Sequence, residues 1–236
     1  MSKFILLASC NSKQGKTLLA IEIAKKLAVK HKVLFVDMSK SSKSAAAYLG
    51  VDENIIYDFV DLISGICSVE EATIKPSNSN HLFDLIPAPR LRNKAVRDSK
   101  IFEKFFMMFS KSYDYVMVDG IDLFQDDIFY DYEGLDKIVF ITEGKIEDLK
   151  KINACIQKLG KENIENVLTV INKYSKTEML KGRMYNQKEL GEMMKLDIIG
   201  EMGFNSEYES IEAMSDQTER ILKDFKDIAV KVVEKL

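Results

Sequence analysis

The sequence predicts a doubly wound α/β domain, with a mostly parallel sheet covered by helices on both faces. Segments with helical spacing of apolar residues separate most of the short apolar runs. The runs themselves are apolar throughout, which is typical of strands buried on both faces. The predicted strands cover residues 4–8, 33–36, 82–86, 115–118, 138–141, 167–171 and 198–199.

The predicted helices follow the strands in the order that a parallel sheet requires. In the first of them, Leu18, Ile21 and Ala24 recur at helical spacing directly after the first strand. Ligands of such sheets bind at the carboxyl ends of the strands, so we expect the functional residues there. The predicted helices span residues 17–29, 99–109, 147–159 and 216–236.

Length and composition favour one domain over residues 1–236. The chain is 46% apolar, contains only 11 glycines and 3 prolines, and shows no convincing linker. Its net charge of -3 argues against a surface built throughout for nucleic acid. The three cysteines are far apart in sequence, so a reducing cytoplasm is the expected setting. The apolar run at the amino terminus, about eight residues long, is too short to span a membrane.

The loop after the first strand carries the most specific motif. Residues 10–17 read CNSKQGKT, which fits the phosphate-loop pattern GxxxxGK[ST] except that Cys10 replaces the first glycine. In this pattern backbone N–H groups and the positive end of a helix face the phosphates. Lys16 would reach the β- and γ-phosphates, and Thr17 would offer its hydroxyl to Mg²⁺. A GKT that merely begins a helix is the alternative.

Together with this loop, several later stretches resemble the MinD/ParA family of dimeric P-loop ATPases, whose fold is the P-loop NTPase fold of the SIMIBI type. VLFVDMS at residues 33–39 is similar to its second strand and first switch, and YDYVMVDG at 113–120 to its Walker B strand. VLTVINKY at 167–174 is similar to the strand whose final asparagine contacts the purine. The resemblance spans nearly the whole chain through the order and spacing of these motifs.

The resemblance implies bound ATP or ADP with Mg²⁺. It assigns Thr17 and Asp119 to the metal, Asp37 to the metal's water shell, and Asn172 to the base. Asp37 and Asp119 would be the catalytic carboxylates. The residues that it implies for cofactor binding are Asn11, Ser12, Lys13, Gln14, Gly15, Lys16, Thr17 and Asn172.

Departures from the family pattern in two segments, the phosphate loop and the first switch, imply weak or absent hydrolysis. Asn11 stands where the family has the signature lysine that reaches across the dimer, and Ser12 and Lys13 replace its glycines. Lys13 could supply the missing charge from another point of the loop. Ser39 replaces the second acidic residue of the first switch, and a hydroxyl is a far weaker proton acceptor than a carboxylate.

The resemblance also bears on partners. The stretch LIPAP at residues 85–89 looks like the TadZ/CpaE branch, which implies a positioning role beside pilus or secretion machinery, with a protein partner and a homodimer as the expected assemblies. Residues 216–236 mix acids with lysines, so we expect no tight DNA binding and no direct membrane anchor. We therefore expect a cytoplasmic protein that a partner recruits to a pole or membrane site. The basic residues Arg90, Arg92, Lys94 and Arg97 could contact an anionic partner.

Two other functions stay open on the sequence. An ordinary MinD/ParA ATPase that cycles between monomer and dimer would share the same motifs, although Asn11 and Ser39 speak against it. A biosynthetic enzyme similar to dethiobiotin synthetase has a related phosphate loop, but its second-strand region carries a substrate-binding lysine motif that VLFVDMS lacks.

Overall fold

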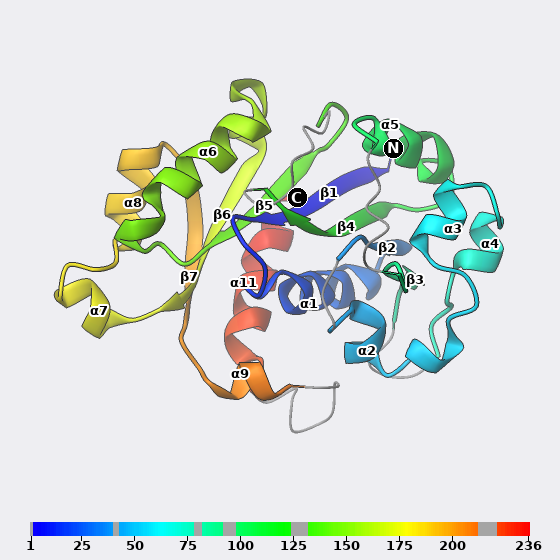
Figure 1. The fold of residues 1–236 in the computed structure, drawn as a ribbon, viewed down its shortest axis with the longest axis horizontal. Helices are drawn as coiled ribbons and strands as arrows, with labels where there is room; N and C mark the ends of the chain where they lie inside the picture. The colour runs from blue at the N-terminus through cyan, green and yellow to red at the C-terminus, as the bar shows by residue number, and fades with distance from the viewer. Residues whose placement is uncertain (1, 40–42, 78–81, 92–97, 124–131, 212–220) are drawn as a thin grey trace.

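The protein forms a seven-stranded sheet with helices on both faces, seen in a computed structural model (Figure 1). The structure describes residues 2–39, 43–77, 82–91, 98–123, 132–211 and 221–236. All the described strand pairs of the sheet run parallel, in the order β3-β2-β4-β1-β5-β6-β7. The strands are β1 (Lys3–Ser9), β2 (Val33–Asp37), β3 (Asp84–Ile86), β4 (Tyr115–Asp122), β5 (Lys137–Thr142), β6 (Val167–Tyr174) and β7 (Asp197–Gly203).

The predicted fold class is therefore confirmed, and every predicted strand is present. The third strand begins two residues later than predicted, at Asp84, whose carboxylate accepts a hydrogen bond from the Tyr113 hydroxyl at 2.8 Å. The last helix, predicted over residues 216–236, is described as α11 (Lys223–Glu234), and the first part of that prediction, residues 216–220, lies outside the described residues.

The longer helices divide between the two faces of the sheet. They are α1 (Lys16–Ala28), α5 (Ile101–Phe109), α6 (Leu149–Leu159), α8 (Gln187–Met194) and α11. The shorter ones are α2 (Ala45–Leu49), α3 (Phe59–Ile63), α4 (Val69–Ala72), α7 (Lys176–Leu180) and α9 (Glu207–Ser210), with 3₁₀ turns at Asp52–Asn54, Ile146–Asp148 and Lys161–Asn166. Side-chain caps begin several of the short helices; Asp58, for example, accepts hydrogen bonds from Val60 and Asp61 at the start of α3.

Each strand sends alternate side chains to opposite faces, so the sheet has two cores. From β1, Phe4 and Leu6 pack with residues of α5 and α6, whereas Ile5 and Leu7 pack with residues of α1 and α11. Helices α1 and α11 pack against each other on the same face of the sheet, and α11 also contacts β7, so most residues of α1 are buried (Figure 1). This packing fixes the loop before α1 against the carboxyl ends of the strands.

Within the described ranges, no helix combines the length and the apolar composition that crossing a bilayer requires.

Candidate functional site

The loop between β1 and α1 turns through two left-handed residues. Lys13 has φ 59° and Gly15, the residue before α1, has φ 84°. An added Cβ on Gly15 would lie 2.6 Å from Nδ2 of Asn172 and 3.3 Å from the Phe225 ring. Glycine is therefore required at this position for both its φ and its packing, because the end of β6 and helix α11 close on it.

The loop is held in shape by hydrogen bonds rather than by glycines. The Asn172 amide donates to the carbonyl oxygen of Gln14 at 2.9 Å, and the Gln14 side chain accepts from the backbone N–H of Asn11 at 3.3 Å. Both Gln14 and Asn172 are buried, whereas Ser12 and Lys13 are exposed. This network accounts for a loop that keeps its course with few glycines.

Lys16 is buried at the start of α1, and its ammonium group is already engaged. It donates to the Ser9 hydroxyl at 2.9 Å and forms an ion pair with the carboxylate of Asp122. The Ser9 hydroxyl in turn donates to the carbonyl oxygen of Asn11 at 2.6 Å. The lysine predicted to bind phosphate therefore has a protein carboxylate as its partner in this structure.

Thr17 and Asp119 meet as the phosphate-loop pattern predicts for a magnesium site. The Thr17 hydroxyl donates to Oδ2 of Asp119 at 2.6 Å. Asp119 is fully buried, and its other oxygen, Oδ1, has no hydrogen-bond partner among the described residues. Burial raises the pKa of Asp119 to about 7, and the negative charge of the neighbouring Asp37 adds to the shift. A buried carboxylate oxygen without a partner is a suitable ligand for a cation or its water.

Asp37 lies beside Asp119, since β2 and β4 pair in parallel with these two residues in register. Its two oxygens accept hydrogen bonds from the backbone N–H groups of Ser39 at 2.8 Å and Ala45 at 2.7 Å. Burial raises its pKa as well. In this structure Asp37 thus fixes the chain after β2, a role that the sequence reasoning did not foresee for it.

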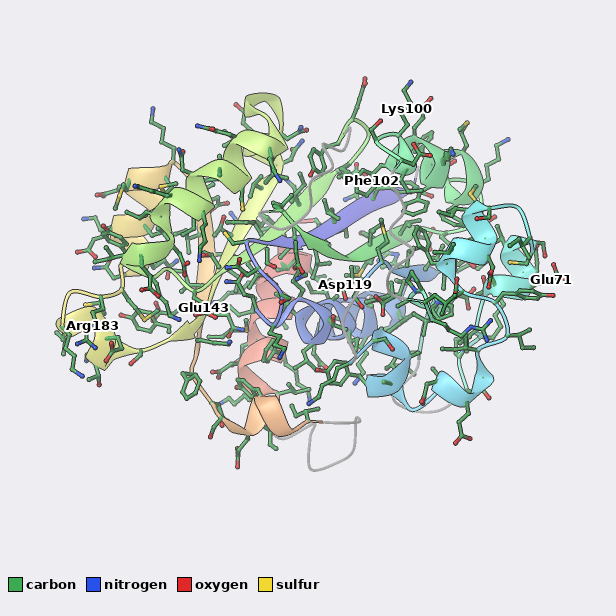
Figure 2. The ribbon with its side chains drawn as sticks, in the orientation of Figure 1. Glu71, Lys100, Phe102, Asp119, Glu143 and Arg183 are labelled. Carbon is green, nitrogen blue, oxygen red and sulfur yellow. The ribbon has the colours of Figure 1, made fainter. Side chains whose placement is uncertain are left out.

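Asn172, expected at the base, has its polar atoms bound to the protein. Besides the Gln14 contact, its Oδ1 accepts from the backbone N–H of Lys173 at 2.7 Å. Lys173 pairs with Glu143 at 3.1 Å, and the same carboxylate pairs with Lys145 at 2.5 Å. Asp119 lies on β4 and Glu143 directly follows β5, with β1 between these two strands, so the ion pairs of Glu143 are separate from the Thr17–Asp119 contact (Figure 2).

The residues of the loop, the start of α1 and β4 suit a polyphosphate with Mg²⁺. They supply Gly15, held without room for a side chain, the buried ammonium group of Lys16, the hydroxyl of Thr17, and Oδ1 of Asp119, which is buried without a partner among the described residues. Among the described residues, no group of three or more His, Cys, Asp or Glu could hold a metal ion. A magnesium ion here would take further ligands from water and phosphate, which is its usual preference.

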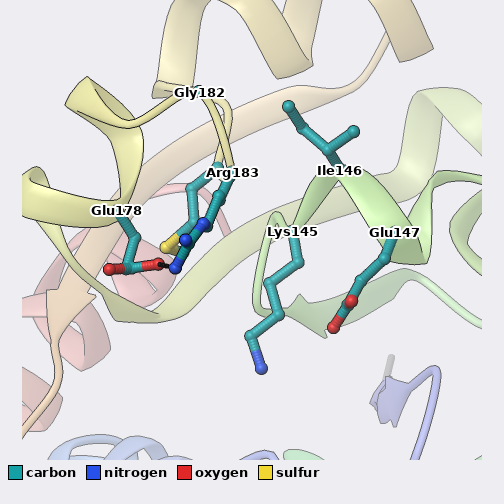
Figure 3. Close-up of a pocket in the computed structure, with 7 residues that line it drawn as sticks. Lys145, Ile146, Glu147, Glu178, Gly182 and Arg183 are labelled. Carbon is teal, nitrogen blue, oxygen red and sulfur yellow. Dashed lines mark hydrogen bonds and ion pairs between the residues drawn. The ribbon is translucent and has the colours of Figure 1, made fainter.

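A separate cavity of about 380 Å³ opens between the turn after β5 and the segment after α7 (Figure 3). Charged residues of both signs line it, and two of them, Glu178 and Arg183, pair with each other at 3.2 Å. The remaining lining residues are Lys145, Ile146, Glu147, Gly182 and Met184. It holds none of the residues predicted for nucleotide.

Of the predicted basic run, only Arg90 is described. Its guanidinium donates to the Ile56 carbonyl oxygen at 2.9 Å and lies 3.9 Å from the carboxylates of Asp58 and Asp61. These contacts engage Arg90 within the protein. Arg92, Lys94 and Arg97 lie outside the described residues.

Residues 5–217 match the family described as "CobQ/CobB/MinD/ParA nucleotide binding domain". The chain belongs to this family. Among curated relatives of this MinD/ParA-family protein, the septum site-determining protein MinD of Bacillus subtilis is 25% identical over 202 residues, which is 85% of this chain and 75% of that protein.

Solved structures of similar fold include MinD from Aquifex aeolicus in the MinC:MinD cell division protein complex. It shares 21% identity, with a TM-score of 0.79 over 99% of this chain and 96% of that one. MinD of Pyrococcus horikoshii complexed with Mg-ADP is 16% identical, with a TM-score of 0.75 over 100% of this chain and 96% of that one. A plasmid partition protein of Borrelia burgdorferi bound to AMPPNP is 17% identical, with a TM-score of 0.72 over 100% of both chains.

The phosphate-loop and Walker B patterns predict Lys16, Thr17 and Asp119 as site residues, and the structure brings Thr17 and Asp119 into contact. The patterns missed Ser9 and Asp122, which contact Lys16. Asp122 follows the predicted Walker B strand, and only the pairing of β1 with β4 places it opposite Ser9.

Proposed function

We propose that this MinD/ParA-family protein binds ATP or ADP with Mg²⁺ at the loop between β1 and α1, and acts as a nucleotide-dependent positioning or assembly factor with weak or absent hydrolysis. The observation that carries the nucleotide site is the contact between Thr17 and Asp119, which leaves Oδ1 of Asp119 buried without a partner in the described part of the chain. The Mg-ADP and AMPPNP complexes of proteins with this fold support the choice of ligand.

Each loop residue has a role that its chemistry permits. The Lys16 ammonium neutralises phosphate charge, while the backbone N–H groups at the start of α1 donate hydrogen bonds to phosphate oxygens. Thr17 and Asp119 hold Mg²⁺, which neutralises charge and orients the phosphates when it is bound. Asn172 acts through Gln14, whose carbonyl oxygen it fixes, so its contribution to binding is to hold the loop.

Weak hydrolysis follows from what stands at two positions. Asn11 carries no charge that could reach a partner's nucleotide, and its backbone is tied to the Gln14 side chain. Ser39 brings a hydroxyl where the family has a second acid, so the attacking water has no strong proton acceptor there. Lys13, exposed on the same loop, is the remaining candidate for the missing charge.

The positioning role rests on the relatives. MinD proteins are septum site-determining proteins, and one of them was solved in complex with MinC. We propose by analogy that this protein is cytoplasmic, with one domain over residues 1–236, and that it forms a homodimer that recruits a protein partner. The TadZ/CpaE resemblance makes pilus or secretion machinery at a pole or membrane site the process to test. A fluorescent fusion that stays diffuse with and without neighbouring pilus genes would contradict this assignment.

Titration calorimetry tests the nucleotide site directly. Wild-type protein is titrated with ATP and ADP in Mg²⁺, alongside Lys16→Ala and, as a matched control, Lys26→Ala, which removes an exposed lysine of α1 outside the loop. We expect binding by wild type and Lys26→Ala, and loss of binding by a folded Lys16→Ala. Equal binding by all three proteins, or none by the wild type, would overturn the site. A turnover assay on the same proteins distinguishes this proposal from an ordinary MinD/ParA ATPase. Mg²⁺-dependent hydrolysis by the wild type that is lost in Lys16→Ala would show an active ATPase and would contradict weak or absent hydrolysis.

A further inference from the structure

The ammonium group of Lys16 is held by two side chains from neighbouring strands. Ser9, the last residue of β1, accepts its hydrogen bond at 2.9 Å, and Asp122, the last residue of β4, forms the ion pair. The ion pair is largely shielded from water, since the Lys16 side chain is 8% exposed and that of Asp122 is 20% exposed.

The sheet itself places Asp122 against Lys16. Strands β1 and β4 pair with Ser9 opposite Asp122, and the backbone N–H of Leu123 donates to the carbonyl oxygen of Ser9 at 2.8 Å. The Ser9 hydroxyl lies 3.3 Å from the Asp122 carboxylate, so all three polar groups form one cluster. The pairing of the two strands therefore fixes the backbone of Asp122 beside the loop, so its carboxylate lies near Lys16 because of the fold of the sheet.

A carboxylate in this place acts on a polyphosphate in two ways. It holds the same ammonium group that the phosphates need, through a charge-assisted contact of the stronger kind. It also adds a negative charge to a site where Asp119 and Asp37 already lie together, and shielding from water strengthens the repulsion of an incoming anion. Both effects oppose nucleotide binding until Asp122 gives up the lysine.

We propose that Asp122 is an internal anion that competes with nucleotide phosphates for Lys16, and so sets the concentration of nucleotide at which the loop is filled. This inference rests on the proposed nucleotide site and deepens it. The ligand-free loop keeps its lysine neutralised and in place, and a nucleotide binds by taking that lysine from the carboxylate. Asp122 is in this sense an affinity-determining residue with no part in the chemistry of hydrolysis.

The test compares nucleotide affinity in Asp122→Asn and in a matched control. Asp148→Asn removes a carboxylate that lies near the same loop but pairs with Lys151 at 2.9 Å. Titration calorimetry with ADP and a slowly hydrolysed ATP analogue in Mg²⁺ measures all three proteins. We expect Asp122→Asn to bind about 10- to 100-fold tighter than wild type, the range of one charged hydrogen bond, and Asp148→Asn to bind like wild type.

A second measurement needs no nucleotide. Thermal melts of Lys16→Met, Asp122→Asn and the double variant form a cycle on the ligand-free protein. We expect the double variant to lose clearly less thermal stability than the two single losses added together, because each single change strands its partner. Additive losses would overturn the pairing itself.

The outcomes separate the two proposals. If wild type binds nucleotide through Lys16 and Asp122→Asn binds equally or more weakly, the competition is refuted while the nucleotide site stands. If neither wild type nor Asp122→Asn binds, both proposals fail. An equal gain of nucleotide affinity in Asp148→Asn would assign the effect to the total negative charge near the loop and would also refute a specific role for Asp122.

Discussion

Replacing Gly15 with alanine is expected to destabilise the protein through two separate costs. The residue has φ 84°, and a side chain in this left-handed region costs about 1–2 kcal/mol. The new Cβ would also lie 2.6 Å from the Asn172 amide, which must move and give up its hydrogen bond to Gln14, a further ~0.5–1.5 kcal/mol. The Phe225 ring at 3.3 Å limits relief in the other direction. The free energy of unfolding should fall by roughly 1.5–3.5 kcal/mol in total.

Gly50→Ala is the matched control for this change. Gly50 has φ 67° but nothing within 4 Å of an added Cβ, so it incurs only the backbone cost of about 1–2 kcal/mol. Urea unfolding of both variants measures the difference, which we expect to be about 1 kcal/mol or more. When Asn172→Ala is added to each variant, the extra loss of stability in Gly15→Ala should disappear, whereas the effect of Gly50→Ala should stay the same. Equal destabilisation by the two glycine changes would refute the packing argument.

Three further expectations concern buried groups. Burial raises the pKa of Asp119 from its ordinary 3.8 to about 7, so between pH 3.8 and about 7 the folded state binds more protons than the unfolded state, and stability falls as the pH rises through this window. Asp119→Asn should flatten the decrease of Tm with pH in thermal melts, and an unchanged decrease would contradict the shift. The Cys155 thiol donates to Cys10 and, with burial, raises the Cys10 pKa, so a thiol reagent should label only Cys67 in the native protein and all three after unfolding; rapid native labelling of either buried thiol would contradict this. Gly120→Ala should fail to fold or lose several degrees of Tm, because its Cβ would lie 2.3 Å from a backbone nitrogen just after β2; wild-type Tm would refute this.

The fold could be predicted from the sequence because its signals are local. Each strand is a short apolar run, and the alternation with helices leaves few other ways to bury both faces. The start of α1 was predicted to within one residue, at Thr17 where the structure has Lys16, since the GKT motif marks it. Boundaries were less certain, as at Asp84, where the strand begins only after a buried aromatic residue.

The contacts of the site were harder to predict because they join distant parts of the chain. Lys16 and Asp122 are 106 positions apart, and only the register of β1 against β4 brings them together. The amide of Asn172 could face a base or a backbone carbonyl, and nothing local to β6 decides between them. The structure shows it on Gln14, 158 positions earlier. Sequence patterns identified the residue types, and tertiary pairing determined their partners.

The place of β1 in the sheet has a consequence for biosynthesis. This strand is synthesised well before both of its neighbours in the sheet, since β4 and β5 come from residues 115–142. A nascent chain that ends before β5 holds an apolar strand with one edge open, which is a hazard for aggregation. We expect release of truncated chains between these two strands to yield insoluble or chaperone-bound fragments, and compact folding to await the synthesis of β5.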